Sequence, residues 1–156
     1  MLKLTLAQLN LTVGDIEGNA AKMVQAAWQA RDEGSQLVVF PELSLTGYYP
    51  GDLLDEPAFL QRVEAGIGAL CAASRQMRGL CWVFGAPVPR GGPGKRLHNM
   101  LLVLRDGEVV LRYAKQLLPT YNVFDERRHF EPGPDVAKVL RIGTAQLRLK
   151  ELAAAE

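Results

Sequence analysis

Residues 36–42, QLVVFPE, decide the fold of this chain: an almost wholly apolar run is followed by a proline and a carboxylate. A short apolar run without polar alternation is typical of a strand that is buried on both faces. Pro41 cannot donate to a strand ladder, so the strand is expected to end there. Glu42 therefore stands at the carboxyl end of a buried strand, which is the edge at which α/β sheets bind ligands.

Outward from this strand, the hydrophobic pattern alternates between the periods of strands and helices. The predicted strands are 2–9, 36–40, 80–84, 97–104, 108–114 and a pair within 139–149. Gly85 and Pro87 are expected to close the strand at 80–84. Asp106-Gly107 joins two of the strands and is a strong hairpin signal.

Two apolar stripes at helical spacing predict helices over residues 20–28 and 59–71. Asn19 is suited to cap the first helix, and Gly34 is suited to stop it. The order strand–helix–strand–helix–strand–hairpin indicates an α/β layered fold with a mixed sheet. The loop at 116–135 is unusually long for a compact domain, and such loops tend to be functional.

Composition places the chain among ordinary globular proteins. Of 156 residues, 48% are hydrophobic and 22% are charged, so disorder is not expected. The 18 basic and 17 acidic residues give a net charge of +1 without a basic stripe, which argues against a nucleic-acid partner. No apolar run is long enough to span a bilayer, so we expect no membrane partner and a cytoplasmic location.

The metal-ligating residue types are sparse in this sequence. Cys71 and Cys81 have neither zinc-ligand nor disulfide-framework spacing, and both are interpreted as buried thiols. His98 and His129 have no second histidine at ligand spacing. We therefore expect no metal site.

Three charged residues are candidates for chemistry, and each also has a plain interpretation. Glu42 could be a partly desolvated general base or a strand-end carboxylate in water. Lys115 could stabilise an oxyanion or serve as a solubilising charge. Glu126 lies in a charged stretch, 123–133, that is most simply a solvated loop.

Two motifs resemble the signatures of the nitrilase superfamily. Residues 40–48, FPELSLTGY, resemble the first, whose glutamate is the general base, and residues 113–121, YAKQLLPTY, resemble the second, whose lysine stabilises the tetrahedral intermediate. Glu126 fits the auxiliary glutamate of the family, and the separation of 73 positions from Glu42 to Lys115 fits its spacing. Residues 45–54 and 118–128 further resemble the glutaminase domains of NAD synthetases.

The resemblance implies a fold and a site. The fold would be a nitrilase-type α-β-β-α sandwich with mixed sheets, of which this chain holds the first part. The catalytic residues would be Glu42, Lys115 and Glu126, and Tyr48 and Tyr121 would line a glutamine pocket. A cysteine would attack the glutamine amide, and the released ammonia would pass to an NAD synthetase domain. No cofactor is expected in this chain, because ATP would belong to the synthetase domain.

The family nucleophile, a cysteine on a strand after the Glu126 loop, has no match here, since no cysteine follows Cys81. We therefore expect residues 1–146 to be a partial carbon–nitrogen hydrolase domain, inactive by itself, and 147–156 to be a divergent C-terminal tail. Another carbon–nitrogen amide hydrolase and a noncatalytic glutamine-binding subunit are the alternatives. Because apolar sheet surface would be left uncovered, we expect a homo-oligomer.

Overall fold

The buried strand predicted at residues 36–40 forms and belongs to a five-stranded mixed sheet. The computed structural model describes residues 1–151. The strands are β1 (Leu4–Leu6), β2 (Leu37–Val39), β3 (Cys81–Pro89), β4 (Leu97–Arg105), β5 (Glu108–Ala114), β6 (Lys138–Ile142) and β7 (Ala145–Leu149). The helices are α1 (Ile16–Asp32) and α2 (Pro57–Ser74), and two short 3-10 turns are η1 (Gly51–Asp55) and η2 (Glu126–Arg128).

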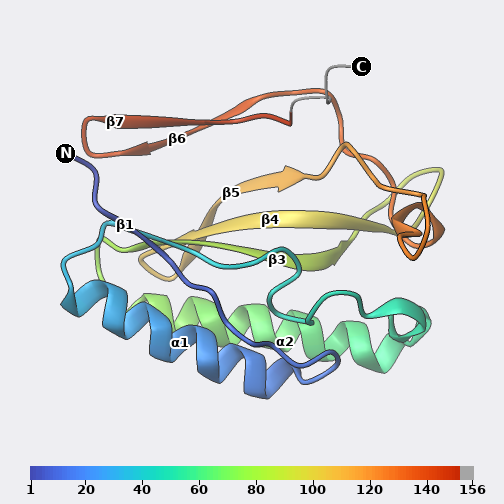
Figure 1. Cartoon of the computed structure of the whole chain (residues 1–156), viewed down its shortest axis with the longest axis horizontal. Helices are drawn as coiled ribbons and strands as arrows, with labels where there is room; N and C mark the ends of the chain where they lie inside the picture. The colour runs from blue at the N-terminus through green and yellow to red at the C-terminus, as the bar shows by residue number, and fades with distance from the viewer. Residues whose placement is uncertain (152–156) are drawn as a thin grey trace.

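The sheet has the strand order β1-β2-β3-β4-β5, with parallel pairing from β1 to β3 and antiparallel pairing from β3 to β5. Helices α1 and α2 cover one face of this sheet, and the β6–β7 hairpin lies over the other (Figure 1). This is the α/β layered architecture that the sequence predicts. No helix within residues 1–151 has the length and apolar character needed to cross a bilayer.

The main core lies between the helices and the sheet. Its largest fully buried side chains include Trp82, Phe84, Met23 and Leu70. A smaller core on the opposite face joins the sheet to the β6–β7 hairpin through Val103, Leu140 and neighbouring residues. The expectation that the second sheet face is left uncovered is therefore corrected in part, because the hairpin buries apolar side chains against it.

The helix start differs from the predicted one. Asp15, not Asn19, caps α1, and its side chain accepts a hydrogen bond from the Gly18 backbone nitrogen at 3.0 Å. Asn19 is fully buried, and its amide bonds the backbone of Thr12 and the carbonyl of Leu45. The helix begins one turn early because Ile16 packs into the core and Asp15 is an equally good capping residue.

Strand β3 also differs, because it continues through Gly85 and Pro87 to Pro89. Strand β2 pairs with β3 only over residues 81–83, so within the described residues no strand pairs with that edge of β3 beyond Val83, although Leu45 N still donates to the Gly85 carbonyl. Proline is tolerated at such an edge, where its missing N–H costs no ladder bond. The predicted hairpin turn is confirmed, since Asp106 and Gly107 both have positive φ, at 53° and 89°.

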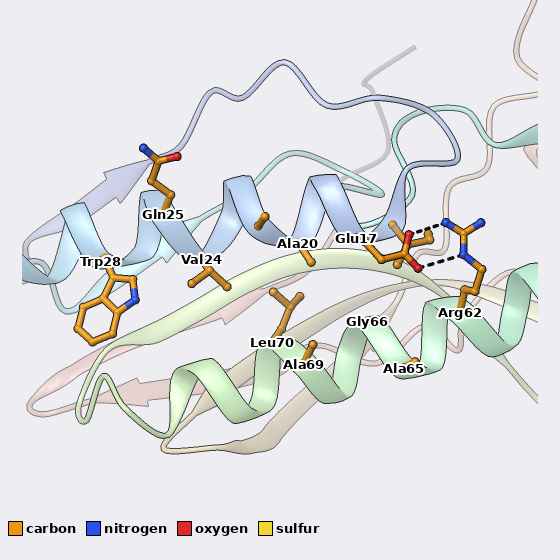
Figure 2. Close-up of a pocket in the computed structure, with 12 residues that line it drawn as sticks. Glu17, Ala20, Val24, Gln25, Trp28, Arg62, Ala65, Gly66, Ala69 and Leu70 are labelled. Carbon is orange, nitrogen blue, oxygen red and sulfur yellow. Dashed lines mark hydrogen bonds and ion pairs between the residues drawn. The ribbon is translucent and has the colours of Figure 1, made fainter.

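An apolar groove of about 680 Å³ runs between α1 and α2 on the outer side of the helix layer. Figure 2 shows Ala20, Val24 and Trp28 of α1 facing Ala65 and Ala69 of α2 across it.

An ion pair joins the two helices beside this groove. Arg62 Nε donates to Glu17 Oε1 at 3.1 Å, and Figure 2 shows the same pair. The hydrogen bond from Arg62 lowers the pKa of the Glu17 carboxyl to about 2.

Candidate active site

Four side chains from four separate segments meet at one end of the sheet. Glu42 follows β2 after two residues, and Lys115 directly follows β5. Asn99 is the third residue of β4, and Glu126 opens the η2 turn. Backbone bonds fix this arrangement: Lys115 N donates to the Asn99 carbonyl at 2.8 Å, and Gly133 N donates to the Lys115 carbonyl at 2.9 Å.

Lys115 bridges the two carboxylates. Its Nζ lies 2.7 Å from Glu42 Oε1 and 2.9 Å from Glu126 Oε2. The structure therefore brings Glu42, Lys115 and Glu126, the three residues that the resemblance implies, into one cluster. Their catalytic roles stay predictions.

Asn99 is the member of this cluster that the sequence analysis missed. Its Nδ2 donates to Glu42 Oε1 and to Glu126 Oε1, both at 2.8 Å. Asn99 is 4% exposed in an otherwise mostly apolar strand. A polar amide at a buried strand position requires partners, and that signal could have identified it.

Not every hydrogen-bonding group of the cluster is used within it. Asn99 uses both amide protons on the two carboxylates, whereas Lys115 uses two of its three ammonium protons. Glu42 Oε2 has no hydrogen-bond partner within residues 1–151, and the Glu42 side chain is 45% exposed. Within the described residues, the cluster therefore leaves two acceptors, Glu42 Oε2 and Asn99 Oδ1, and one ammonium proton of Lys115 unbonded.

The electrostatics of the cluster are set by burial of Glu126. Its side chain is only 1% exposed, and burial raises the pKa of this carboxyl above its ordinary value despite the bonds from Lys115 and Asn99. Burial acts to lower the pKa of Lys115, but its hydrogen bonds to Glu42 and Glu126 outweigh burial and raise it. Lys115 is thus held in its charged form.

A cavity of about 330 Å³ opens beside the cluster. Its polar lining comes from Glu42, Asn99, Lys115 and Glu151, and its remaining walls are apolar residues of β2 to β5 and their ends. The Glu151 carboxylate accepts bonds from the backbone nitrogens of Gln116 at 2.6 Å and Leu117 at 2.7 Å. The region 147–156 was expected to be a tail, but residues 147–149 belong to β7 and Glu151 lines the cavity. Residues 152–156 of the expected tail lie outside the described residues.

Neither of the two tyrosines expected to bind substrate is among the cavity-lining residues. Tyr48 and Tyr121 both pack against Phe124, with ring centroids 6.3 Å and 5.6 Å away. Burial raises the pKa of Tyr48, and the charges of Glu126 and Glu42 raise it further. The charges of the cluster therefore act on the Tyr48 hydroxyl. Tyr121, in contrast, is 64% exposed.

Neither cysteine lies in the cavity. Cys81 pairs with Leu37 at the start of β2, the opposite end from Glu42, and it is fully buried. Cys71 lies near the end of α2. Burial raises the pKa of both thiols, which disfavours the reactive thiolate.

Comparisons with known sequences find relatives that match most of this chain. This chain is 40% identical over 148 residues to the glutamine-dependent NAD(+) synthetase of Thermotoga maritima, covering 94% of this chain and 24% of that protein. It is 44% identical over 149 residues to the same-named protein of Rhodobacter capsulatus, covering 93% and 25%. The chain thus spans about a quarter of the length of these relatives.

Solved structures show the same fold. The glutamine-dependent NAD+ synthetase from Acinetobacter baumannii, in complex with ADP, matches with a TM-score of 0.82 and 32% identity, over 93% of this chain and 26% of that chain. A mutant of the Nesterenkonia AN1 amidase from the nitrilase superfamily matches with a TM-score of 0.81 and 28% identity, over 94% and 54%.

The family model for carbon-nitrogen hydrolases matches residues 3–152, nearly the whole chain. This match includes both motifs and every member of the Glu42–Asn99–Lys115–Glu126 cluster. The chain therefore belongs to the carbon-nitrogen hydrolase family.

Proposed function

We propose that this chain supplies the base, the oxyanion-stabilising cation and the positioning groups of a glutamine amide hydrolase that provides ammonia for NAD synthesis. The observation that carries the proposal is the bridge of Lys115 between Glu42 and Glu126. The 40–44% identity to glutamine-dependent NAD synthetases supports glutamine as the amide.

The free groups of the cluster suit this reaction. An unactivated amide requires a strong nucleophile, a base that generates it and a donor for the developing oxyanion. Glu42 Oε2 is free to accept the nucleophile's proton, and the third ammonium proton of Lys115 is free to bond the carbonyl oxygen. Buried Glu126 and Asn99 hold these two groups in place.

The nucleophile must come from outside the described cleft, because both cysteines of this chain lie elsewhere in the fold. Solved structures of the Nesterenkonia amidase carry covalent additions at an active-site cysteine. In our proposal a cysteine that this chain does not contain is likewise the nucleophile. It attacks the glutamine amide, ammonia leaves with the proton that Glu42 took from the thiol, and water then hydrolyses the thioester.

The position of the cysteines also favours a second candidate. A chain that keeps the Glu42–Lys115 pair without a nucleophile could bind glutamine as a noncatalytic subunit. Another amide hydrolase is a weaker alternative, because residues 45–54 and 118–128 resemble the glutaminase domains more closely.

A chimaera tests the proposal. Residues 1–146 of this chain replace the matching segment of the Thermotoga maritima protein, and NAD synthesis is measured with glutamine or with ammonia. Glu42→Gln should lower glutamine-supported synthesis by about 10²–10⁴-fold, the usual contribution of a general base. Ammonia-supported synthesis reports that the rest of the protein is intact, and Glu64→Gln, an exposed change on α2, is the matched control.

Equal glutamine-supported synthesis by the parent chimaera and its Glu42→Gln variant would contradict the proposed role of Glu42. A chimaera that binds glutamine but supports synthesis only with ammonia would favour the noncatalytic subunit.

A further inference from the structure

Outside the cleft, a histidine and two aspartates meet where the two 3-10 turns approach each other. Asp52 and Asp55 belong to η1, and His129 directly follows η2. His129 Nε2 lies 3.6 Å from Asp55 Oδ2 and 4.0 Å from Asp52 Oδ1. One ligand atom from each of the three residues lies within 4.8 Å of the others.

The histidine provides an observation independent of the two acidic groups. Its side chain is 4% exposed, and Nε2 has no hydrogen-bond partner within residues 1–151. A buried polar atom without a partner is costly, so such an atom calls for an explanation. Nε2 points toward the two carboxylates, which are themselves exposed.

The other ring nitrogen is already engaged. Tyr49 Oη lies 2.7 Å from His129 Nδ1, and the two rings pack with centroids 5.9 Å apart. When the Tyr49 hydroxyl accepts the Nδ1 proton, Nε2 presents its lone pair to the aspartates. An outer hydrogen bond of this kind orients the histidine in many metal sites.

We propose that Asp52, Asp55 and His129 bind one zinc-like divalent transition-metal ion. An imidazole nitrogen with two carboxylates is a ligand set that zinc accepts, whereas magnesium and calcium prefer oxygen alone. Ligands at zinc distances stand roughly 3.3–3.5 Å apart in a tetrahedral site. The 3.6 Å separation is close to that value and the 4.0 Å separation is longer by roughly half an ångström, a difference that exposed aspartates can close.

One neighbouring cation competes for this place. Arg128 lies 3.0 Å from Asp52 Oδ1, and its side chain is 58% exposed. The guanidinium can turn into solvent when the ion binds, but its charge opposes the ion. Removing Arg128 should therefore tighten binding, an effect that is not expected of ions scattered over surface carboxylates.

The ion links two turns of the chain, η1 and η2. Turn η1 closely follows Tyr48 and Tyr49, and turn η2 begins with Glu126. The sequence expectation of no metal site rested on the missing second histidine, and it did not weigh one histidine with two aspartates from a distant part of the chain.

The test measures Zn²⁺ binding to the untagged protein by competition with a chromophoric chelator. We expect one ion per chain, with affinity lowered by about tenfold or more in His129→Gln and in Asp55→Asn, and by about 10–100-fold in Tyr49→Phe. His98→Gln, which changes the other histidine of the chain, is the matched control and should bind like the parent. Arg128→Gln should bind more tightly.

Two further readouts do not depend on the chelator. Co²⁺ in place of Zn²⁺ should give visible absorption bands that His129→Gln removes. Saturation with Zn²⁺ at about a hundredfold over the Kd should raise the Tm of the parent by roughly 5–10 °C, and Mg²⁺ should leave it unchanged. The absence of micromolar binding, or equal binding by the parent and His129→Gln, would overturn the proposal and leave His129 as an ion-pair partner of the aspartates.

Discussion

Lys115 and Glu42 are 73 residues apart in the sequence, and their Nζ and Oε1 atoms lie 2.7 Å apart in the structure. Strands β4 and β5 create this contact, because their pairing returns the chain from Asn99 to Lys115 at the end of the sheet where β2 stops. Glu126 completes the arrangement from the long loop that follows.

Removing Lys115 should destabilise the fold through Glu126. Lys115→Met leaves a fully buried carboxylate without its cation, and breaking a buried pair costs about 3–5 kcal/mol. Because Lys115 is 25% exposed, we expect the lower part of that range or less, about 2–3 kcal/mol at pH 8. Urea unfolding measures it. The double variant Lys115→Met, Glu126→Gln should recover much of the loss, and equal stability of the two variants would contradict this coupling.

The pH dependence of stability should report the raised pKa of Glu126. Burial raises this pKa above 4.5, so the folded protein binds the proton more tightly than the unfolded chain does. The resulting stability is complete below pH 4.5 and is lost as the pH rises through the folded pKa. The Glu126→Gln variant has no carboxyl to titrate and does not lose this stability. Its free energy of unfolding relative to that of the parent should therefore increase as the pH rises from 4.5 through the folded pKa. Urea unfolding from pH 4 to pH 8 gives the comparison, and a constant difference would refute it.

Gly85→Ala should disturb the position of Glu42. A Cβ at Gly85 would lie 2.4 Å from the backbone nitrogen of Leu43, the residue after Glu42, so the backbone must move. Overpacking of this kind costs about 1–3 kcal/mol. Gly68→Ala on α2 is the control, since nothing lies within 4 Å of its Cβ position, and it should be neutral or stabilising. Thermal unfolding of both variants tests the difference, and Gly85→Ala as stable as Gly68→Ala would contradict the packing argument.

The isolated chain should release no meaningful ammonia from glutamine. Loss of a nucleophile that acts together with its base costs orders of magnitude in rate. Purified protein with glutamine and an ammonia assay measures this directly. Turnover that disappears in Cys71→Ser or Cys81→Ser would show that a thiol reaches the cleft by a movement absent from this structure.

Self-association is expected through the groove between α1 and α2 (Figure 2). In a two-fold arrangement the same apolar patch is buried twice. Light scattering over a dilution series should give masses above the 17.1 kDa monomer, and Ala69→Glu in the groove should lower them. Gln61→Glu, which adds the same charge outside the groove lining, is the control. A mass of 17.1 kDa at every concentration would exclude association.

Much of the fold could be predicted because the strands and turns carry local signals. The limits of β5 match the predicted range, and the positive φ of Gly107 explains the turn before it. The predictions failed where tertiary packing decided between local options. Asp15 and Asn19 are both good caps, and only the burial of Asn19 against Thr12 and Leu45 separates them.

The resemblance predicted the site only at residues that stand in its motifs. Glu42, Lys115 and Glu126 stand in such motifs, and the structure brings them together. Asn99 lies in strand β4. Its side-chain amide donates to Glu126 and to Glu42, which are 27 and 57 positions away in the sequence. No local pattern encodes such a pairing. The contact between Asp52 and His129 could not be predicted from the sequence for the same reason.

The four-segment construction of the cluster has a consequence for how the protein reaches its native state. Contacts between residues far apart in sequence close late, because chain entropy opposes them until neighbouring structure has formed. The β4–β5 hairpin can form early, but Glu42 and Glu126 reach Lys115 only after the parallel strands and the long loop have docked. The NMR signals of the Asn99 side-chain amide in a refolding experiment should therefore be among the last to become native-like. These signals would report the completion of folding.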